Sequence, residues 1–327
     1  MVRSRFVACT VAALSLSWFP GVASAESGKG FECRQMAEMP IPATATEWLE
    51  RSMLAGHCYI FQARAVRISR EGVRTLALSH DIRDGVVREV ASYLDGPPVV
   101  YERHGKIVEG QGVSGDARSI APSLDAGSIP QYYRLTLGGE ERIAGRRSVR
   151  LDVEPLDNLR YGHRLWLDTQ TGLPLKQVLL DVDGRILETF QMTELVDPSL
   201  YDQAVSFATL DSRPEGPWQP GWVPSGYQSV PLPDPSDAPG SALSHRLYSD
   251  GLSSFSLFIE PLAGNSPALR PGLHRLGISY AAVRHLPLDG RLMQIVVMGE
   301  LPPQVLVRVA AELQYQPDAG RTASSSS

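Results

Sequence analysis

Short runs of alternating apolar and polar residues recur along this 327-residue chain, and a pair made of an acidic residue and glycine separates many of them. Such pairs suit tight hairpin turns, because glycine has no Cβ and adopts positive φ angles at little cost. The pattern therefore predicts antiparallel sheets built from hairpins. The pairs are Glu71-Gly72, Asp84-Gly85, Asp95-Gly96, Asp183-Gly184, Asp250-Gly251 and Asp289-Gly290.

The first 200 residues contain one short helix and two groups of strand patterns. The helix is expected from Thr46 to about Leu54, with Thr46 as its N-cap. The first group of strands reads as an antiparallel meander, expected at 59–69, 73–80, 86–93 and 99–103. The second group is expected at 133–137, 148–154, 163–168, 175–182 and 185–195.

The last two of these strands are apolar on both faces. A sheet with one face in solvent shows a polar face, so the second face here is expected to be covered or to line a cavity. Ordinary core filling is the alternative for the large apolar residues of this region. The candidates for lining a cavity are Trp166, Leu179, Phe190 and Met192.

Prolines become frequent between Thr209 and Gly240, which marks a domain boundary. We expect a large domain over 26–210, a linker over 211–218 and a smaller domain over 219–316. The smaller domain shows strand patterns at 243–248, 252–260, 278–285 and 291–299, then a helix from Pro302-Pro303 to about Tyr315. Residues 317–327 are serine-rich and are expected to be a disordered tail.

Residues 1–25 have the pattern of a secretory signal peptide. Arg3 and Arg5 precede a short apolar run, and Ala23-Ser24-Ala25 predicts cleavage after Ala25 and export to the periplasm. Cleavage changes the formal charge from −5 to −7, because it removes two arginines and no acidic residue. Such an acidic chain is a poor candidate for binding nucleic acid through its phosphates.

Two cysteines remain in the exported chain, Cys33 and Cys58. In an oxidising compartment such a pair forms a disulfide, here closing a loop of about 25 residues. Two unpaired thiols are the alternative. Neither cysteine belongs to a CxxC pair, so redox catalysis and zinc binding gain no support.

Motifs of known enzymes are missing from this sequence. It contains no GxSxG, HExxH or Walker sequence, and the Gly110–Gly115 match to GxGxxG is followed by prolines instead of a helix. We therefore expect no enzyme, cofactor or metal site. A cluster of arginines forms a candidate basic patch, for which a solvated outer face is the alternative: Arg142, Arg146, Arg147, Arg150, Arg160 and Arg164.

Several strings resemble the MucB/RseB family, in the family's order and over about residues 46–315. The longest runs from His163 to Asp168 and on through Thr171-Gly172-Leu173, and resembles the family's "RLWLD…TGL" sequence. The others are Ser92–Pro98, Tyr132–Leu135 with Gly138–Glu140 and Ala144–Arg146, Asp183–Arg185, Tyr248–Leu252 with Phe258–Leu262, and Val297–Pro303. The Cys33 and Cys58 pair does not belong to this pattern.

The resemblance implies an α+β, β-rich fold. It implies a large domain like LolA and LolB, in which helices cover the concave face of a curved antiparallel half-barrel sheet around a lipid-type cavity, and a smaller α+β C-terminal domain. It further implies a negative regulator of an envelope-stress sigma factor. Such a protein binds the periplasmic domain of a membrane anti-sigma factor, protects it from proteolysis, and releases it on sensing lipoprotein acyl chains or lipopolysaccharide. A periplasmic lipoprotein or lipid carrier is the alternative. The resemblance leaves open whether the protein forms a homo-oligomer.

Overall fold

The computed structural model describes residues 30–83, 85–96, 100–104, 126–206, 217–230, 244–262 and 268–316. The predicted signal peptide, the Gly110–Gly115 motif and the serine-rich tail lie outside these ranges. Most of the predicted linker does so as well.

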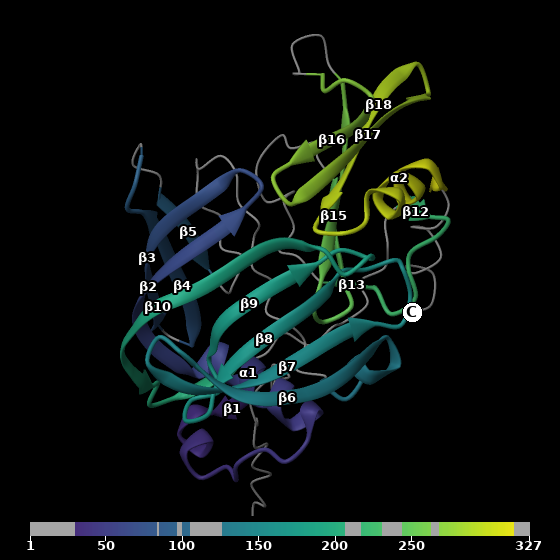
Figure 1. The fold of residues 1–327 in the computed structure, drawn as a ribbon. Coiled ribbons are helices and arrows are strands. Elements are labelled where there is room, and N and C mark those ends of the chain that lie inside the picture. The colour runs from purple at the N-terminus through teal and green to yellow at the C-terminus, as the bar shows by residue number, and fades with distance from the viewer. Residues whose placement is uncertain are drawn as a thin grey trace, which may run out of the picture.

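A bent sheet of nine antiparallel strands forms the large domain (Figure 1). The order β5-β4-β3-β2-β10-β9-β8-β7-β6 joins the two predicted groups of strands through the pairing of β2 with β10. This confirms the expected strand-rich fold with antiparallel hairpins. The strands are β2 (Tyr59–Ser69), β3 (Gly72–Arg83), β4 (Val86–Tyr93), β5 (Val100–His104), β6 (Tyr133–Ile143), β7 (Arg146–Pro155), β8 (Gly162–Asp168), β9 (Pro174–Leu180) and β10 (Ile186–Leu200).

Helix α1 (Ala45–Cys58) packs on one face of this sheet. Its N-cap is Thr44, so the predicted cap at Thr46 was wrong. The Thr44 hydroxyl accepts from the Glu47 amide, and the Glu47 carboxylate accepts from the Thr44 amide, which completes a capping box. The helix also continues one turn beyond the predicted end at Leu54.

Four short elements complete the large domain. The 3₁₀ helix η1 (Cys33–Ala37) follows strand β1 (Gly30–Glu32), which pairs with β11 (Ala204–Ser206). A second 3₁₀ helix, η2 (Ile129–Gln131), leads into β6. The N-terminal segment is thus held against the last strand of its domain.

The smaller domain is a six-stranded antiparallel sheet with helix α2 (Pro303–Ala311) packed against it (Figure 1). The helix was predicted to reach Tyr315, but it ends at Ala311, and β19 (Leu313–Tyr315) then pairs with β12 (Trp218–Pro220). Trp218 is buried in this domain's core and does not lie in a linker. The sheet runs β13 (Gln228–Val230), β14 (Ser244–Ser249), β15 (Ser254–Pro261), β18 (Arg291–Gly299), β17 (Ser279–Leu288) and β16 (Gly272–Leu276).

Candidate functional site

Three of the four predicted cavity residues share the sheet face on which α1 packs, here called the α1 face. Leu165 lies in the same apolar cluster as α1. It pairs with Gln177, which pairs with Phe190, and residues opposite one another in adjacent strands share a face. Leu179 and Met192 lie two residues from Gln177 and Phe190, so they share that face as well.

Strand alternation places Trp166 on the opposite side of β8 from Leu165. It is the residue after Leu165 in β8, and its partners are Arg150 and Lys176. The Lys176 ammonium lies 4.4 Å from the centre of the indole ring, a cation–π contact. Trp166 nevertheless lies in one buried apolar cluster with Met192 and with Leu54 of α1. Its place in a cavity therefore stays a prediction.

Phe190 is the most open of the three large apolar side chains on the α1 face. Leu179 and Met192 are buried, whereas Phe190 is half-buried. Its cross-strand partner is Arg67, whose Nε donates to Glu188 Oε2 at 2.6 Å. Part of the α1 face thus combines an accessible aromatic ring with a half-buried ion pair, an arrangement that suits an amphiphile.

His163 lies beside Leu179 on the α1 face. Burial lowers the pKa of His163 to about 4, from an ordinary value of 6.5, and the nearby Asp250 opposes this only in part. The Gln177 amide lies 3.4 Å from His163 Nδ1 and donates to it in the neutral tautomer that accepts there. The imidazole is therefore held neutral in the folded chain.

We expect acid to destabilise the protein through His163. Above pH 6.5 the residue is neutral in both folded and unfolded chains; between pH 6.5 and about 4 only the unfolded chain binds the proton, so stability falls over this window. We expect the free energy of unfolding, measured with urea, to fall less between pH 7 and pH 4.5 in His163→Gln than in the wild type. His274→Gln, at a half-buried position on the edge strand β16, is the control. Equal losses in wild type and His163→Gln would contradict the assignment.

The predicted basic patch is largely neutralised by nearby carboxylates. Arg160 does not belong to it at all, because its side chain is fully buried. Arg142 donates to the Gly145 carbonyl. The ion pairs join Arg146 to Asp168, Arg147 to Glu140, Arg150 and Arg164 to Asp152, and Arg160 to Asp157 and Asp250.

Arg160 instead forms a buried ion pair between the two domains. Its Nη1 donates to Asp250 Oδ2 at 2.7 Å, and both side chains are fully buried. The Tyr133 hydroxyl donates to the same carboxylate oxygen at 2.8 Å. Ser253 binds the other oxygen through its amide at 2.8 Å. We call Tyr133, Arg160, Asp250 and Ser253 the interdomain cluster.

Aromatic rings enclose the Arg160 guanidinium. Tyr132, Tyr133 and Tyr227 lie with their ring centres 5.1 to 5.4 Å from its central carbon. Burial raises the pKa of the Tyr133 and Tyr227 hydroxyls well above the ordinary value, so both stay protonated. A Cβ at Gly226, where φ is +90°, would lie 2.6 Å from the Tyr132 ring, so only glycine allows this close approach.

A second contact between the domains joins two turns. A Cβ at Gly277, after β16, would lie 3.3 Å from Glu71 in the turn between β2 and β3. A hollow of about 300 Å³ opens there, lined by Arg70, Glu71, Arg275 and Gly277. Among the described residues, the small domain therefore contacts the large one in at least two separated places.

The sequence patterns did not predict the interdomain cluster, although three of its residues belong to features that they did predict. Asp250 was interpreted as a hairpin residue, Tyr133 as part of a strand, and Arg160 as a surface cation. The resemblance to family strings around Tyr133 and Asp250 was the available signal, but it carried no role for either side chain.

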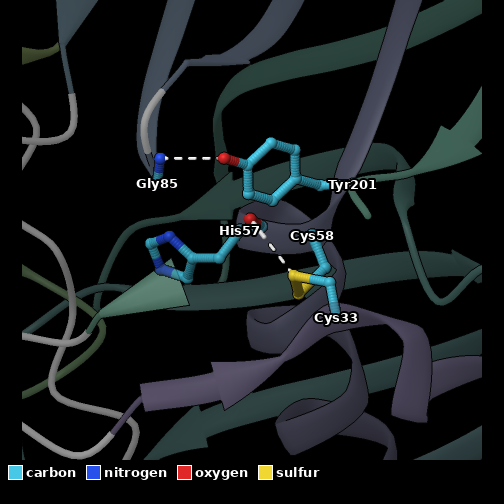
Figure 2. The surroundings of a disulfide bond; sticks show 5 residues. All are labelled: Cys33, His57, Cys58, Gly85 and Tyr201. Carbon is cyan, nitrogen blue, oxygen red and sulfur yellow. Dashed lines mark hydrogen bonds between the residues drawn. A yellow bond between two sulfur atoms is a disulfide. The ribbon is translucent and has the colours of Figure 1, made fainter. Parts of the chain in front are cut away.

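Cys33 and Cys58 form a disulfide in this structure, with both residues fully buried and their Cα atoms 5.2 Å apart (Figure 2). The bridge joins η1 to the last residue of α1. Tyr201 lies beside it: its amide donates to the Cys58 carbonyl and its hydroxyl accepts from the Gly85 amide at 3.1 Å. Three segments of the large domain thus meet at the bridge.

Two kinds of feature do not occur among the residues with described positions. None of their His, Cys, Asp and Glu side chains gather in groups of three or more that could hold a metal ion. None of the helices in this part of the chain combines the length and apolarity needed to cross a membrane.

Comparison with known proteins covers both domains. The MucB/RseB N-terminal domain family matches residues 44–208, and the MucB/RseB C-terminal domain family matches residues 212–314. The sigma factor AlgU regulatory protein MucB of Pseudomonas aeruginosa is 33% identical, over 86% of this chain and 95% of its own. The sigma-E factor regulatory protein RseB of Salmonella typhimurium is 32% identical, over 82% of this chain and 90% of its own.

Solved structures show the same likeness. The complex of MucA and MucB from Pseudomonas aeruginosa contains a chain that is 29% identical, with a TM-score of 0.61 over 83% of this chain and 99% of that one. MucB in complex with MucA(peri) is 31% identical, with a TM-score of 0.59 over 83% and 98%. On the match of both domains and this degree of identity, the chain belongs to the MucB/RseB family.

Proposed function

We propose that this protein is a sigma-factor regulatory protein that binds the periplasmic segment of a membrane anti-sigma factor and protects it from proteolysis. The observation that carries the proposal is the similarity to MucB over both domains, including a MucB structure solved in complex with MucA(peri). The signal-peptide pattern and the buried disulfide support a periplasmic location, since disulfides persist in oxidising compartments.

Isothermal titration with MucA(peri) of Pseudomonas aeruginosa tests the proposal, with the periplasmic segment of the anti-sigma factor from this protein's own organism as a second probe. We expect binding with a Kd of about 1 µM or below, equivalent to about −8 kcal/mol. In a protease assay, the bound segment should be cleaved more slowly. A folded protein that binds neither segment would contradict the proposal.

Release of the partner on lipid binding is the finer part of the proposal. Converting a mostly bound population to a mostly free one needs about 5.5 kcal/mol of differential affinity. Each buried methylene contributes about 0.8 kcal/mol, so roughly seven methylenes supply this. The α1 face supports such a role, because Phe190 is half-buried beside the Arg67–Glu188 pair.

Phe190→Asp is expected to abolish the binding of an acylated peptide and leave the chain folded. A charge on the α1 face opposes entry of an acyl chain, because burying an unpaired carboxylate is strongly unfavourable. Fluorescence titration with an acylated peptide measures the loss. Ile186→Asp, at an exposed position on the same strand, is the matched control. Unfolding of Phe190→Asp, detected by circular dichroism, would assign Phe190 to the core instead.

A lipid carrier without a protein partner is the second candidate. The part-open α1 face fits it, but the smaller domain does not. That domain has its own core and is joined to the large one by a buried ion pair, which a carrier has no evident need for. Lipid transfer between vesicles, with no binding to either anti-sigma segment, would favour the carrier.

A further inference from the structure

Tyr133 belongs to two buried groups at once. Its ring lies in an apolar cluster with Trp48 and Leu49 of α1. Its hydroxyl donates to Asp250 of the smaller domain at 2.8 Å. The same side chain therefore contacts the core beneath α1 and the carboxylate at the centre of the interdomain cluster.

The neighbours of Asp250 touch that apolar cluster as well. A Cβ at Gly251 would lie 3.1 Å from the Ile129 side chain, and Ile129 is fully buried in the cluster. Leu252 packs against the cluster from the smaller domain. Three successive residues of the turn between β14 and β15 therefore rest on the core that α1 covers.

Asp250 is held by a full set of donors. Oδ2 accepts from Arg160 and Tyr133, and Oδ1 accepts from the Leu252 and Ser253 amides and the Ser253 hydroxyl. Its position is fixed by hydrogen bonds from both domains. A displacement of one domain relative to the other therefore breaks the bonds from Arg160 and Tyr133 together.

The charge of this contact makes intermediate arrangements unfavourable. If Arg160 separates from Asp250 and no water enters, each side chain keeps a buried charge without a partner, which is strongly destabilising. A contact of this kind is either closed or fully open. It thus has two discrete states, which transmission between distant sites requires.

We propose that Tyr133 and the Arg160–Asp250 pair couple the position of helix α1 to the orientation of the smaller domain. Displacement of α1, by whatever enters the α1 face, shifts Tyr133 and opens the ion pair. Conversely, an open ion pair loosens the packing of α1. Figure 1 shows the geometry: the small sheet meets the large one where β6 and β8 begin and β7 ends, and α1 lies along the same strands. The inference deepens the proposed function but does not need the partner to be present.

Hydrogen exchange and small-angle X-ray scattering on the full chain test this coupling. In Asp250→Asn we expect a larger radius of gyration, because the ion pair opens. We also expect exchange of the α1 amides from Trp48 to Leu54 to become about tenfold faster, equivalent to about 1.4 kcal/mol of lost protection. Arg147→Gln, which breaks the exposed pair with Glu140, should change neither.

Tyr133→Phe distinguishes coupling between α1 and the smaller domain from a general loss of stability, because it removes one hydroxyl and keeps the ring. It should speed α1 exchange in the same direction as Asp250→Asn, and it serves as the test if Asp250→Asn fails to fold. Faster exchange confined to the turn between β14 and β15, with α1 unchanged, would overturn the proposal. A Tyr133→Phe protein that loses anti-sigma binding while its α1 exchange stays unchanged would also overturn the coupling. The proposed function would stand, because binding by the wild type tests it separately.

Discussion

Replacing Asp168 with alanine should lower the free energy of unfolding by about 3 kcal/mol, the low end of the range for breaking a buried ion pair, because its partner Arg146 is partly exposed. Asp168 is almost fully buried. Its two oxygens accept from Arg146 Nε and Nη2 at 3.1 and 2.8 Å, a bidentate pair. One oxygen also accepts from the Thr171 amide and hydroxyl. Alanine removes this acceptor from Arg146 Nε and from the buried Thr171 amide and hydroxyl, although Arg146 Nη2 still donates to Gln170 Oε1.

The effect should extend to α1, because the turn that Asp168 holds supports the helix. Arg51 of α1 donates to the Gln170 carbonyl in this turn. A Cβ at Gly172 would lie 2.9 Å from Arg51 Cγ. The turn and the helix are therefore in direct contact, and disorder in the one removes packing from the other.

Urea unfolding followed by circular dichroism measures this change. Asp183→Ala is the matched control, since Asp183 pairs with Arg185 at an exposed hairpin, where such pairs contribute less than about 1 kcal/mol. Asp168→Asn should lie between the control and Asp168→Ala, because it retains one acceptor. A loss below about 1 kcal/mol in Asp168→Ala would show that the carboxylate does not organise this turn.

The strands were predictable because their signals are local. Period-two alternation and acidic-Gly turns depend on a few adjacent residues, and the hairpins of both sheets follow them. The pairing of β2 with β10 joins residues more than 100 positions apart, and no local pattern specifies it. The face of each residue in the joined sheet therefore had to come from the structure.

Arg160 and Trp166 show what sequence patterns omit. An arginine in a polar turn normally lies in solvent. Arg160 pairs with the nearby Asp157, but Asp250 and the three tyrosine rings around it come from distant segments. Trp166 is large and apolar, but its neighbours across the strands are Arg150 and Lys176. In both residues the burial and the contacts are set by partners that composition and spacing do not identify.

The end of α1 was misplaced for a different reason. Gly56 and His57 are weak helix formers, which favours an earlier end. The helix nevertheless continues to Cys58, which is bonded to Cys33 and buried. Tertiary contacts at this residue outweigh the local preference.

The Cys33–Cys58 bridge holds this end of α1 to the N-terminal segment. Cys33 follows β1, which pairs with β11, so the segment contacts both the start and the end of the large domain. In the unfolded chain the bridge closes a loop between residues 25 positions apart, which reduces the conformational entropy of that state. Its removal should therefore destabilise the large domain without changing any charge.

The double change Cys33→Ala and Cys58→Ala, in the chain without residues 1–25, is expected to lower the free energy of unfolding by about 3 kcal/mol. Urea unfolding measures the loss, and a free-thiol assay counts the cysteines. A reducing agent should shift the unfolding curve of the bridged protein toward that of the double variant and leave the variant unmoved. If reduction exposes two thiols in the bridged protein but its curve stays in place, the bridge contributes nothing to stability, and the β1–β11 pairing alone must hold the N-terminal segment.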